Sequence, residues 1–232
     1  MAQTAFERPL SRTSLAEAAY QQLLEAILAG RLTNGTELSE VALAAQLQVS
    51  RTPIHEAIRR LAADGLVRID ASRIAYVAEF SRGDVVEIFE LRALLETAAA
   101  ERAATRMSDE QIAELRAAAM AIADRTARQW IAKALEFDVL FHNCIAEASG
   151  NERLRAEIGK YRHLVRAFCR MSGNAANLGA AYEEHLVILE AIAAREPEAA
   201  RQAMATHIAA RLNAVLRELP EADASGNQGS AP

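Results

Sequence analysis

Hydrophobic positions repeat at helical spacing along most of the chain, with one short exception near the front. Up to residue 78 the pattern predicts three helices, at 15–30, 40–47 and 51–65, and then two β-rich runs, at 66–69 and 74–80, that form a hairpin. Ser14, Ser39 and Ser50 stand at the expected helix N-caps. Three short helices followed by a hairpin indicate a winged helix-turn-helix.

From residue 82 the pattern changes to long helices with few breakers. We expect six, at 83–106, 109–126, 129–149, 152–171, 177–195 and 197–218. The predicted fold is therefore mostly α, with an N-terminal winged helix-turn-helix and a C-terminal antiparallel six-helix bundle. The expected ranges are a flexible arm at 1–13, a DNA-binding domain at 14–78, a linker at 79–82, a helical domain at 83–218 and a disordered tail at 219–232.

Composition agrees with a helical protein. The 232 residues are 51% hydrophobic and include only 10 glycines and 5 prolines. The sequence has no apolar run of about 18 residues, so no membrane span is predicted. The pattern of a secretory signal, a basic segment followed by an apolar one, is not seen either. We therefore expect a cytoplasmic protein in which Cys144 and Cys169 are free thiols.

Charge is distributed unevenly between the two predicted domains. The net charge of -5 argues against a general affinity for nucleic acid. However, residues 1–78 hold 8 basic and 8 acidic side chains, whereas residues 79–232 hold 18 and 23. The acidity lies in the C-terminal part, so a local basic patch near the front stays compatible with DNA binding.

The third predicted helix opens with SRTPIHEAIRR, the end that a helix-turn-helix places in the major groove. Arg51 can bond both acceptors of a guanine, and Ser50 and Thr52 suit phosphate oxygens. His55 lies at the same end, and Arg73 at the hairpin tip is placed to enter a minor groove. The alternative is a small helical subdomain with surface arginines.

The run LSEVALAAQLQVSRTPIHEAIRRLAADGLV resembles the DNA-binding domain of GntR-family transcription regulators. The resemblance covers about residues 14–78. It implies that Ser50, Arg51 and Thr52 contact a double-stranded DNA operator.

Three residues depart from the pattern of that family. His55 stands in place of a usual arginine, Val41 in place of an arginine that some members carry, and Ile74 in place of a usual wing-tip glycine. We expect these departures to change which operator is read and how tightly, and not the class of protein.

Four polar residues fall on the apolar stripes of three predicted helices. Asp138 and His142 stand one turn apart, while His185 and His207 are each 11 residues from Glu196. In an antiparallel hairpin both would lie about 16 Å from the turn, at ~1.5 Å per residue. Buried polar groups need partners, and one carboxylate with three imidazoles suits Zn, Ni, Mn or Fe as a divalent ion. The alternative is separately hydrogen-bonded core histidines.

The helical part, over roughly 83–216, resembles the FCD domain of the FadR subfamily, and its six helices are similar to the VanR-like branch. Metal-binding members carry an aspartate and a histidine one turn apart and two further histidines on the last two helices. Asp138, His142, His185 and His207 match that pattern. The resemblance implies a small organic acid bound beside, or on, the metal.

Arg92 interrupts the apolar stripe of its helix, one turn before Glu96. A buried arginine can bind a carboxylate through two N–H groups, so Arg92 is the candidate effector-binding residue. An internal pair with Glu96 is the alternative. Arg162 and Arg166 are weaker candidates, and His163 is expected at the surface.

Together these patterns predict a ligand-responsive transcription regulator, acting as a repressor and binding its operator as a homodimer. The motifs HExxH, GxSxG, Walker and GxGxxG do not occur, so we expect no enzyme. Two alternatives stay open. One is a metal-dependent hydrolase built in a helical bundle, and the other is a regulator whose metal is purely structural.

Overall fold

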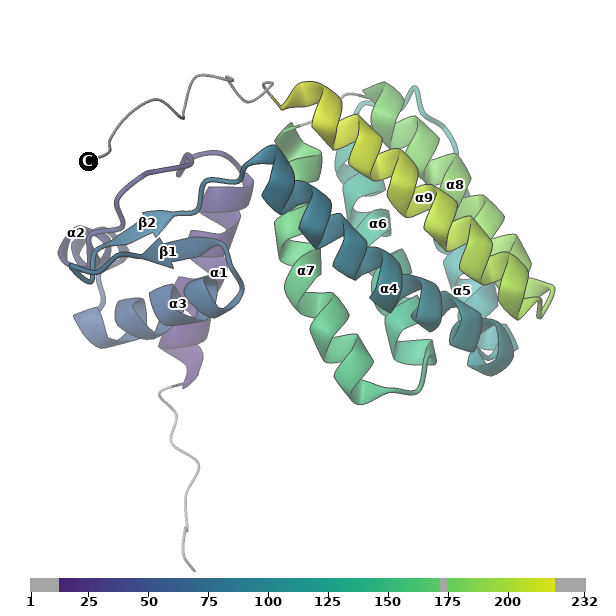
Figure 1. Cartoon of the computed structure of the whole chain (residues 1–232), viewed down its shortest axis with the longest axis horizontal. Helices are drawn as coiled ribbons and strands as arrows, with labels where there is room; N and C mark the ends of the chain where they lie inside the picture. Colours follow the sequence, from purple (N-terminus) through teal and green to yellow (C-terminus); the bar gives the residue numbers. More distant parts are fainter. Residues whose placement is uncertain (1–12, 172–174, 220–232) are drawn as a thin grey trace, which may run out of the picture. The chain divides into compact units, whose positions relative to one another are not determined.

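Residues 13–171 and 175–219 are described by the structure, a computed structural model, and their regular elements are helices and one two-stranded hairpin. The chain divides into two units between Glu79 and Phe80. The first unit contains α1 (Thr13–Leu28), α2 (Glu40–Leu47), α3 (Arg51–Ala63), β1 (Val67–Ile69) and β2 (Ala75–Val77). The second contains α4 (Arg82–Arg106), α5 (Asp109–Met120), α6 (Trp130–Ala148), α7 (Glu152–Met171), α8 (Ala175–Ala193) and α9 (Pro197–Glu218) (Figure 1). The mostly helical fold class is confirmed.

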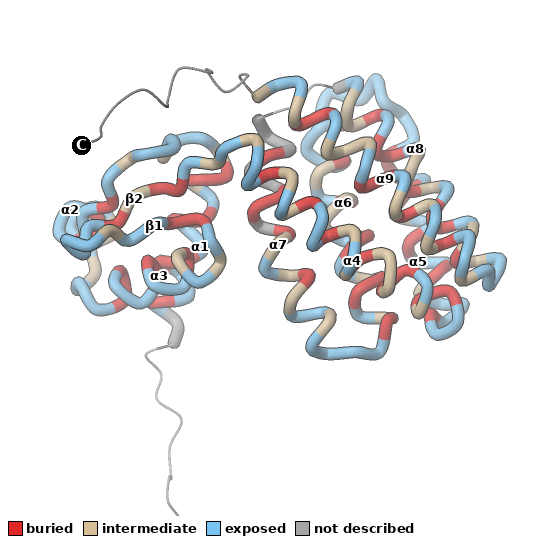
Figure 2. Tube along the Cα trace, in the orientation of Figure 1, coloured by how far each residue is buried: buried red, intermediate tan, exposed pale blue. Residues whose placement is uncertain are grey.

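The core of the first unit forms where α1 packs against α3. Ile54, Ile58 and Leu61 of α3 are buried, as their spacing predicts, and α1 contributes Leu23 and Leu24 from the other side. Full burial of one such side chain contributes about 1.5–3 kcal/mol. Figure 2 shows this buried side of α3 in red, while the start of α3 is exposed.

The hairpin pairs β1 and β2 antiparallel, with Val67 opposite Val77. At its tip the Asp70 carboxylate accepts a hydrogen bond from the backbone N–H of Ile74, at 2.9 Å. Arg73 adopts a left-handed backbone conformation there, with φ 62°. The tip is therefore a tight, side-chain-capped turn that carries an exposed arginine.

In the second unit, α4 and α9 pack side by side along much of their length (Figure 1). Small buried side chains let the two backbones approach: Ala99, Ala100, Ala103 and Ala104 on α4, and Ala200 on α9. Because α4 also contacts α6, α7 and α8, it is the central helix of the bundle. Within the described ranges, no helix combines the length and apolar character needed to cross a membrane.

The segment between α5 and α6 differs from the prediction. The fifth helix was expected to reach residue 126 but ends at Met120. The Asp124 carboxylate accepts hydrogen bonds from both the backbone N–H and the hydroxyl of Thr126, and this local turn competes with helix continuation. Trp130, buried at the start of α6, closes the segment by donating its indole N–H to the carbonyl of Ile122, at 2.8 Å.

Serines stand at the N-cap positions of α2, α3 and α5, whereas the start of α1 differs from the prediction. Ser39 and Ser108 cap α2 and α5 through their hydroxyls, which accept bonds from backbone N–H groups. Ser50 holds the cap position of α3 but its hydroxyl makes no capping bond. The cap predicted at Ser14 is wrong, because α1 already begins at Thr13. The predicted arm and tail lie almost entirely outside the described residues.

Candidate metal centre and nucleic-acid interface

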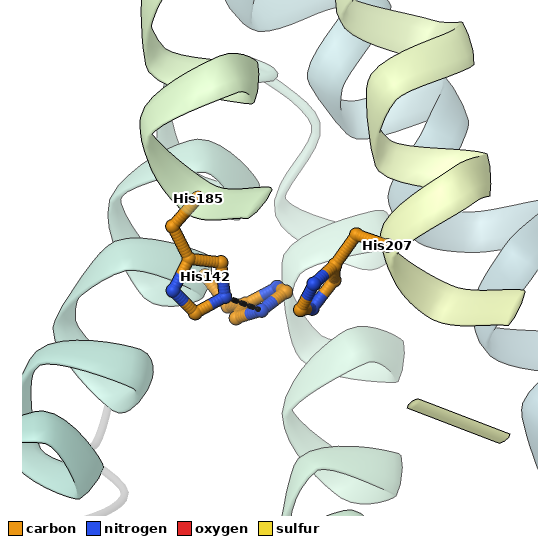
Figure 3. Close-up of side chains that lie close together, drawn as sticks. All are labelled: His142, His185 and His207. Carbon is orange, nitrogen blue, oxygen red and sulfur yellow. Dashed lines mark hydrogen bonds between the residues drawn. The ribbon is translucent and has the colours of Figure 1, made fainter. Parts of the chain in front are cut away.

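Three histidines from three helices meet inside the bundle (Figure 3). His142 comes from α6, His185 from α8 and His207 from α9, and each is 1% exposed. Their ligand-capable atoms all lie within 4.8 Å of one another, and the two Nε2 atoms of His142 and His185 are 3.2 Å apart. We call these residues the histidine cluster. His185 and His207 face each other as their equal distances from Glu196 predict.

Asp138 lies beside the cluster, one helical turn before His142. Its Oδ1 is 3.7 Å from Nε2 of His142 and 3.6 Å from Nε2 of His185. Its Oδ2 accepts a short hydrogen bond from the Arg162 guanidinium of α7. The side chain is 24% exposed, so this carboxylate forms the more open edge of the site.

Two further carboxylates orient the imidazoles from behind. Oε2 of Glu96 lies 2.5 Å from Nδ1 of His142, and Oε2 of Glu184 lies 2.8 Å from Nδ1 of His207. A carboxylate at Nδ1 favours the tautomer with its proton on Nδ1, which leaves the Nε2 lone pair directed into the cluster. Both rings are thus held in the form that binds a cation.

Each of the three carboxylates is itself paired with an arginine. Arg92 donates from Nε to Glu96 at 2.7 Å, and Arg211 donates from Nη2 to Glu184 at 2.9 Å. Arg162 does the same for Asp138. Sequence reasoning ranked Arg162 as a weak candidate and gave Glu184 no role. The hairpin spacing offered a signal for Glu184, which stands 12 residues before Glu196, nearly level with His207.

Arg92 is 1% exposed and makes the internal pair with Glu96 that the sequence left open as an alternative. The pair uses only Nε of the guanidinium. Nη1 of Arg92 is buried without a hydrogen-bond partner among the described residues. A buried donor without a partner is costly, so this edge of Arg92 is the part of the site suited to an anion.

Burial sets the protonation state of the cluster. It lowers the pKa of all three imidazoles, most strongly for His185 and His207, and neighbouring positive groups lower it further. For Asp138, burial alone would raise the pKa, but the positive charge of Arg162 holds it well below its usual range. Neutral imidazoles and an ionised carboxylate are the forms that bind a metal.

The donor set fits a divalent metal ion. Two nitrogens bound to one Zn²⁺ at about 2.0–2.1 Å in tetrahedral geometry are separated by about 3.3 Å. The Nε2 atoms of His142 and His185 are 3.2 Å apart. Imidazoles with one carboxylate suit Zn and other first-row transition ions better than Mg or Ca. His142, His185 and His207 can therefore hold a metal ion through nitrogen, and Asp138 offers an oxygen as a fourth donor at the same place.

In the first unit, the residues predicted to read DNA lie exposed at the start of α3. Ser50 and Thr52 occupy the N-terminal end of the helix, where free backbone N–H groups suit phosphate oxygens. The side chains of Arg51 and His55 are 68% and 55% exposed. The helix therefore presents all four predicted groups to solvent.

Glu40, at the first position of α2, was not recognised from the sequence. Its carboxylate accepts from Nη2 of Arg51 at 3.0 Å and lies 2.7 Å from Nδ1 of His55. These contacts lower the pKa of Glu40, and the hydrogen bond with His55 has the largest influence. We call Glu40, Arg51 and His55 the recognition cluster. It joins the first helix of the helix-turn-helix to the two longest candidate DNA-reading side chains of α3.

The departures from the family pattern lie on the surface. Val41 is 62% exposed next to Glu40, and Ile74 is 37% exposed beside Arg73 at the hairpin tip. Neither side chain is needed for the core, so both are free to alter contacts outside the protein.

Some predicted residues fall where side chains are not described. These are His163, Arg166 and Cys169, all on α7. Cys144, on α6, is a free thiol at intermediate burial.

Two family models match the chain in adjacent ranges. Residues 15–77 match "Bacterial regulatory proteins, gntR family", and residues 87–210 match "FCD domain". The first range covers the recognition cluster, and the second covers Arg92 and all the residues of the candidate metal centre. The division agrees with the two units of the fold.

Curated relatives with similar sequences are transcription regulators. The "Probable D-xylose utilization operon transcriptional repressor" of Paenarthrobacter nicotinovorans is 30% identical over 95% of this chain and 97% of its own length. The "Nta operon transcriptional regulator" of Aminobacter aminovorans is 29% identical over 78% and 85%. Such relatives support the prediction that the chain is not an enzyme.

Among solved structures, E. coli McbR/YncC is similar in fold. Its TM-score is 0.74 at 22% identity, over 88% of this chain and 98% of its own. A GntR transcriptional regulator from Rhodococcus sp. RHA1 gives a TM-score of 0.72 at 24% identity, over 88% and 99%. The order of a small winged unit and a helical bundle is thus shared with solved proteins.

Proposed function

Since this chain belongs to the GntR family of bacterial regulatory proteins and carries an FCD domain, we propose that it is a repressor controlled by a metal-bound organic acid. DNA binding and transcription regulation follow from the family. The metal, the acid and the repressing sign of the response are the proposal. The observation that carries it is the histidine cluster with Asp138, together with the buried, unpartnered Nη1 of Arg92.

The operator-reading role is supported by the exposed side chains at the start of α3. Arg51 reads a base edge, His55 lies one turn further along the groove, and Ser50 and Thr52 hold phosphates. Arg73, on the capped hairpin tip, reaches the adjacent minor groove. The Glu40 contacts keep Arg51 and His55 together until DNA replaces them.

A homodimer presents two such helices to successive major grooves about one turn apart. Support comes from α4, on the side away from its buried face. Leu91 is 41% and Leu94 is 72% exposed, an apolar pair that water disfavours. We assign this pair to the contact with a second copy of the chain. Leu94→Glu should shift the protein from dimer to monomer in analytical ultracentrifugation, and an unchanged dimer would contradict this assignment.

In the effector pocket, His142, His185, His207 and Asp138 hold the metal, and Arg92 offers its free Nη1 to the acid. The bound ion supplies a positive centre for a carboxylate. The chain's own groups orient the imidazoles and exclude water, since the three histidines and Arg92 are all buried. The ligand therefore acts on α4, α6, α8 and α9 at once.

Arg82 offers a route from the pocket to the DNA-binding unit. It is the first residue of α4, and its Nη1 donates to the carbonyls of Leu216 and Leu219 at the end of α9, at 2.5 and 2.9 Å. α9 carries His207, and α4 follows directly on the predicted linker. A shift of α9 would thus move the start of α4. Operator affinity would then change by the difference between the ligand's affinity for the DNA-binding state of the protein and its affinity for the DNA-releasing state.

The test combines three measurements on the purified protein. Elemental analysis should find about one divalent ion per chain, and a thermal-shift screen of small carboxylates should give hits that a chelator abolishes. A hit should then weaken binding to the native operator. Metal-dependent melting with no effect of metal or acid on DNA affinity would support a purely structural metal instead, and turnover of a carboxylate or ester would support a hydrolase.

A further inference from the structure

Glu40 places a negative charge within the part of the molecule that is predicted to bind DNA. It is the first residue of α2, and its side chain is 27% exposed. In a helix-turn-helix, the first of the two helices crosses the DNA backbone. The N-terminus of a helix favours phosphate oxygens, but a carboxylate at this end repels them. The charge of Glu40 therefore opposes the binding of any DNA.

The carboxylate of Glu40 holds two side chains of α3, one through each of its oxygens. Oε2 accepts from Nη2 of Arg51 at 3.0 Å, and Oε1 lies 2.7 Å from Nδ1 of His55. Arg51 and His55 stand one turn apart, so they share a face of the helix. Because the hydrogen bonds from His55 and Arg51 lower the pKa of Glu40, the group is ionised near neutral pH. An ionised carboxylate only accepts, so the shared hydrogen belongs to Nδ1 of His55.

An anion that binds two basic side chains through two oxygens offers them the same kind of contact as a DNA phosphate. In the protein without DNA, Arg51 and His55 already have such a partner in Glu40. Both side chains must leave Glu40 before they can contact DNA. The nucleic acid therefore competes with an internal anion for these two groups.

This competition ends differently on the two kinds of DNA. An exposed ion pair changes an equilibrium by at most about fivefold. A bidentate contact with the correct base is favoured over the wrong base by about fivefold to 150-fold, so the operator can displace Glu40. Non-specific DNA offers mainly phosphates, and exchanging one anion for another gains little. Glu40 thus weakens non-specific binding more than operator binding.

We propose that Glu40 is a specificity-determining residue of this regulator, an internal competitor that keeps Arg51 and His55 from the phosphates of non-specific DNA. This rests on the proposed operator-reading role of α3 and assigns part of its selectivity to a repulsive group. Specific interfaces use such groups beside their attractive contacts. Glu40 itself contacts no base and acts through Arg51 and His55.

The experiment compares Glu40→Gln with the unmodified full chain on two DNA probes by fluorescence anisotropy. One probe is a duplex that the unmodified chain selects from a randomised library, and the other is a scrambled duplex of the same length and composition. Glu40→Gln keeps the size of the side chain and removes its charge. It should bind the scrambled duplex about tenfold more tightly and the selected duplex no more than about threefold more tightly. The ratio of the two affinities should therefore fall about threefold.

Salt dependence separates this role from a structural one. Each phosphate contact adds about 0.9 to the slope of log affinity against log salt concentration. Release of Arg51 and His55 from Glu40 should therefore steepen the slope on the scrambled duplex by about one to two. A merely structural change in α2 would weaken binding to both duplexes without steepening the slope, and that result would overturn the proposal.

Glu37→Gln is the matched control for the loss of one negative charge. Glu37 is exposed, lies three residues before Glu40 and makes no ion pair with the described part of the chain. This variant should change the affinities for both duplexes by the same small factor. A further variant combines Glu40→Gln with Arg51→Ala and His55→Ala, and there Glu40→Gln should add no more than Glu37→Gln does. An effect of full size in that background would contradict action through Arg51 and His55.

The remaining outcomes distinguish the ways in which the proposal can fail. An unchanged or larger affinity ratio in Glu40→Gln would overturn the internal competitor and leave the operator-reading role of α3 intact. Weaker binding to the selected duplex alone would also overturn it, because Glu40 would then read a base itself, such as the amino group of cytosine. If the unmodified chain selects no duplex from the library, the operator-reading role fails and the competitor fails with it.

Discussion

The recognition cluster and the histidine cluster both hold basic side chains against carboxylates, but they do so in opposite environments. Arg51 and His55 are more than half exposed beside Glu40, whereas the histidines and their partners Arg92 and Glu96 are nearly inaccessible to water. Exposed ion pairs contribute about 0–1 kcal/mol. Removing one partner of a buried pair costs about 3–5 kcal/mol.

The difference indicates what each cluster can do. The recognition cluster can exchange its internal bonds for DNA at little cost, so its residues tune function without affecting the fold. In the histidine cluster, stability and function are joined, because the carboxylates that contact the imidazoles are also the partners of Arg92, Arg162 and Arg211.

The largest effect that would test this contrast is expected at Glu96. Glu96→Ala leaves the guanidinium of Arg92 buried without its partner and frees Nδ1 of His142, so the free energy of unfolding should fall by about 3–5 kcal/mol. Glu40→Ala is the matched change in the recognition cluster and should cost no more than about 1 kcal/mol. Urea unfolding followed by circular dichroism measures both. Similar losses for the two variants would remove the contrast.

The next largest effect concerns the metal. A ligand present at about 100 times its Kd stabilises the folded state by about 2.7 kcal/mol. His185→Ala removes one of the three nitrogen donors and should abolish this zinc-dependent rise in melting temperature. His55→Ala, which removes an exposed histidine, should keep it. A zinc-dependent rise of full size in His185→Ala would show that the ion binds elsewhere.

At the front of the molecule the expected effect is on DNA and not on stability. Arg51→Ala should weaken binding to the specific operator by about 1–3 kcal/mol, with the melting temperature and metal content unchanged. Arg31→Ala, an exposed arginine of the same unit outside the recognition helix, should leave operator affinity as it is. Gel-shift titration with specific and scrambled DNA separates the two. Loss of stability in Arg51→Ala would contradict the independence of this cluster.

The smallest effect is expected on the pH dependence of stability in the metal-free protein, counted for each imidazole of the histidine cluster. Burial lowers the pKa of each cluster imidazole in the folded state, so below about pH 6.5, the ordinary histidine value, the unfolded chain binds protons that the folded chain does not. Stability should therefore fall as pH falls through this range, by at most about 1.4 kcal/mol per pH unit for each imidazole. His185→Ala should show a shallower dependence than His55→Ala in chelator-treated samples. Equal slopes would mean that the buried imidazoles do not set the pH response.

Much of the fold could be predicted from the sequence because the signals are local. Helical periodicity, capping serines and the Glu196-Pro197 break define the helices, and equal spacing from that break brings His185 and His207 together. The predicted end of the fifth helix was wrong because Asp124 and Thr126 form a side-chain turn that periodicity does not reveal.

The partners behind the metal donors could not be predicted in the same way. Arg162 reaches Asp138 from a different helix, and its position depends on how α7 packs against α6. Glu40 meets Arg51 and His55 only because α2 and α3 fold against each other. Pairing across helices is a property of tertiary packing, so single-helix patterns identify the donors but not the groups that balance them.

The chain contains a single tryptophan, and its position has a practical consequence. Trp130 begins α6, the helix of Asp138 and His142, and its buried indole is tied to the carbonyl of Ile122. Its emission colour depends on how polar its surroundings are, so any displacement of α6 on ligand binding would change the light the protein emits. The intrinsic fluorescence of Trp130 can thus report movement of α6 without any attached dye.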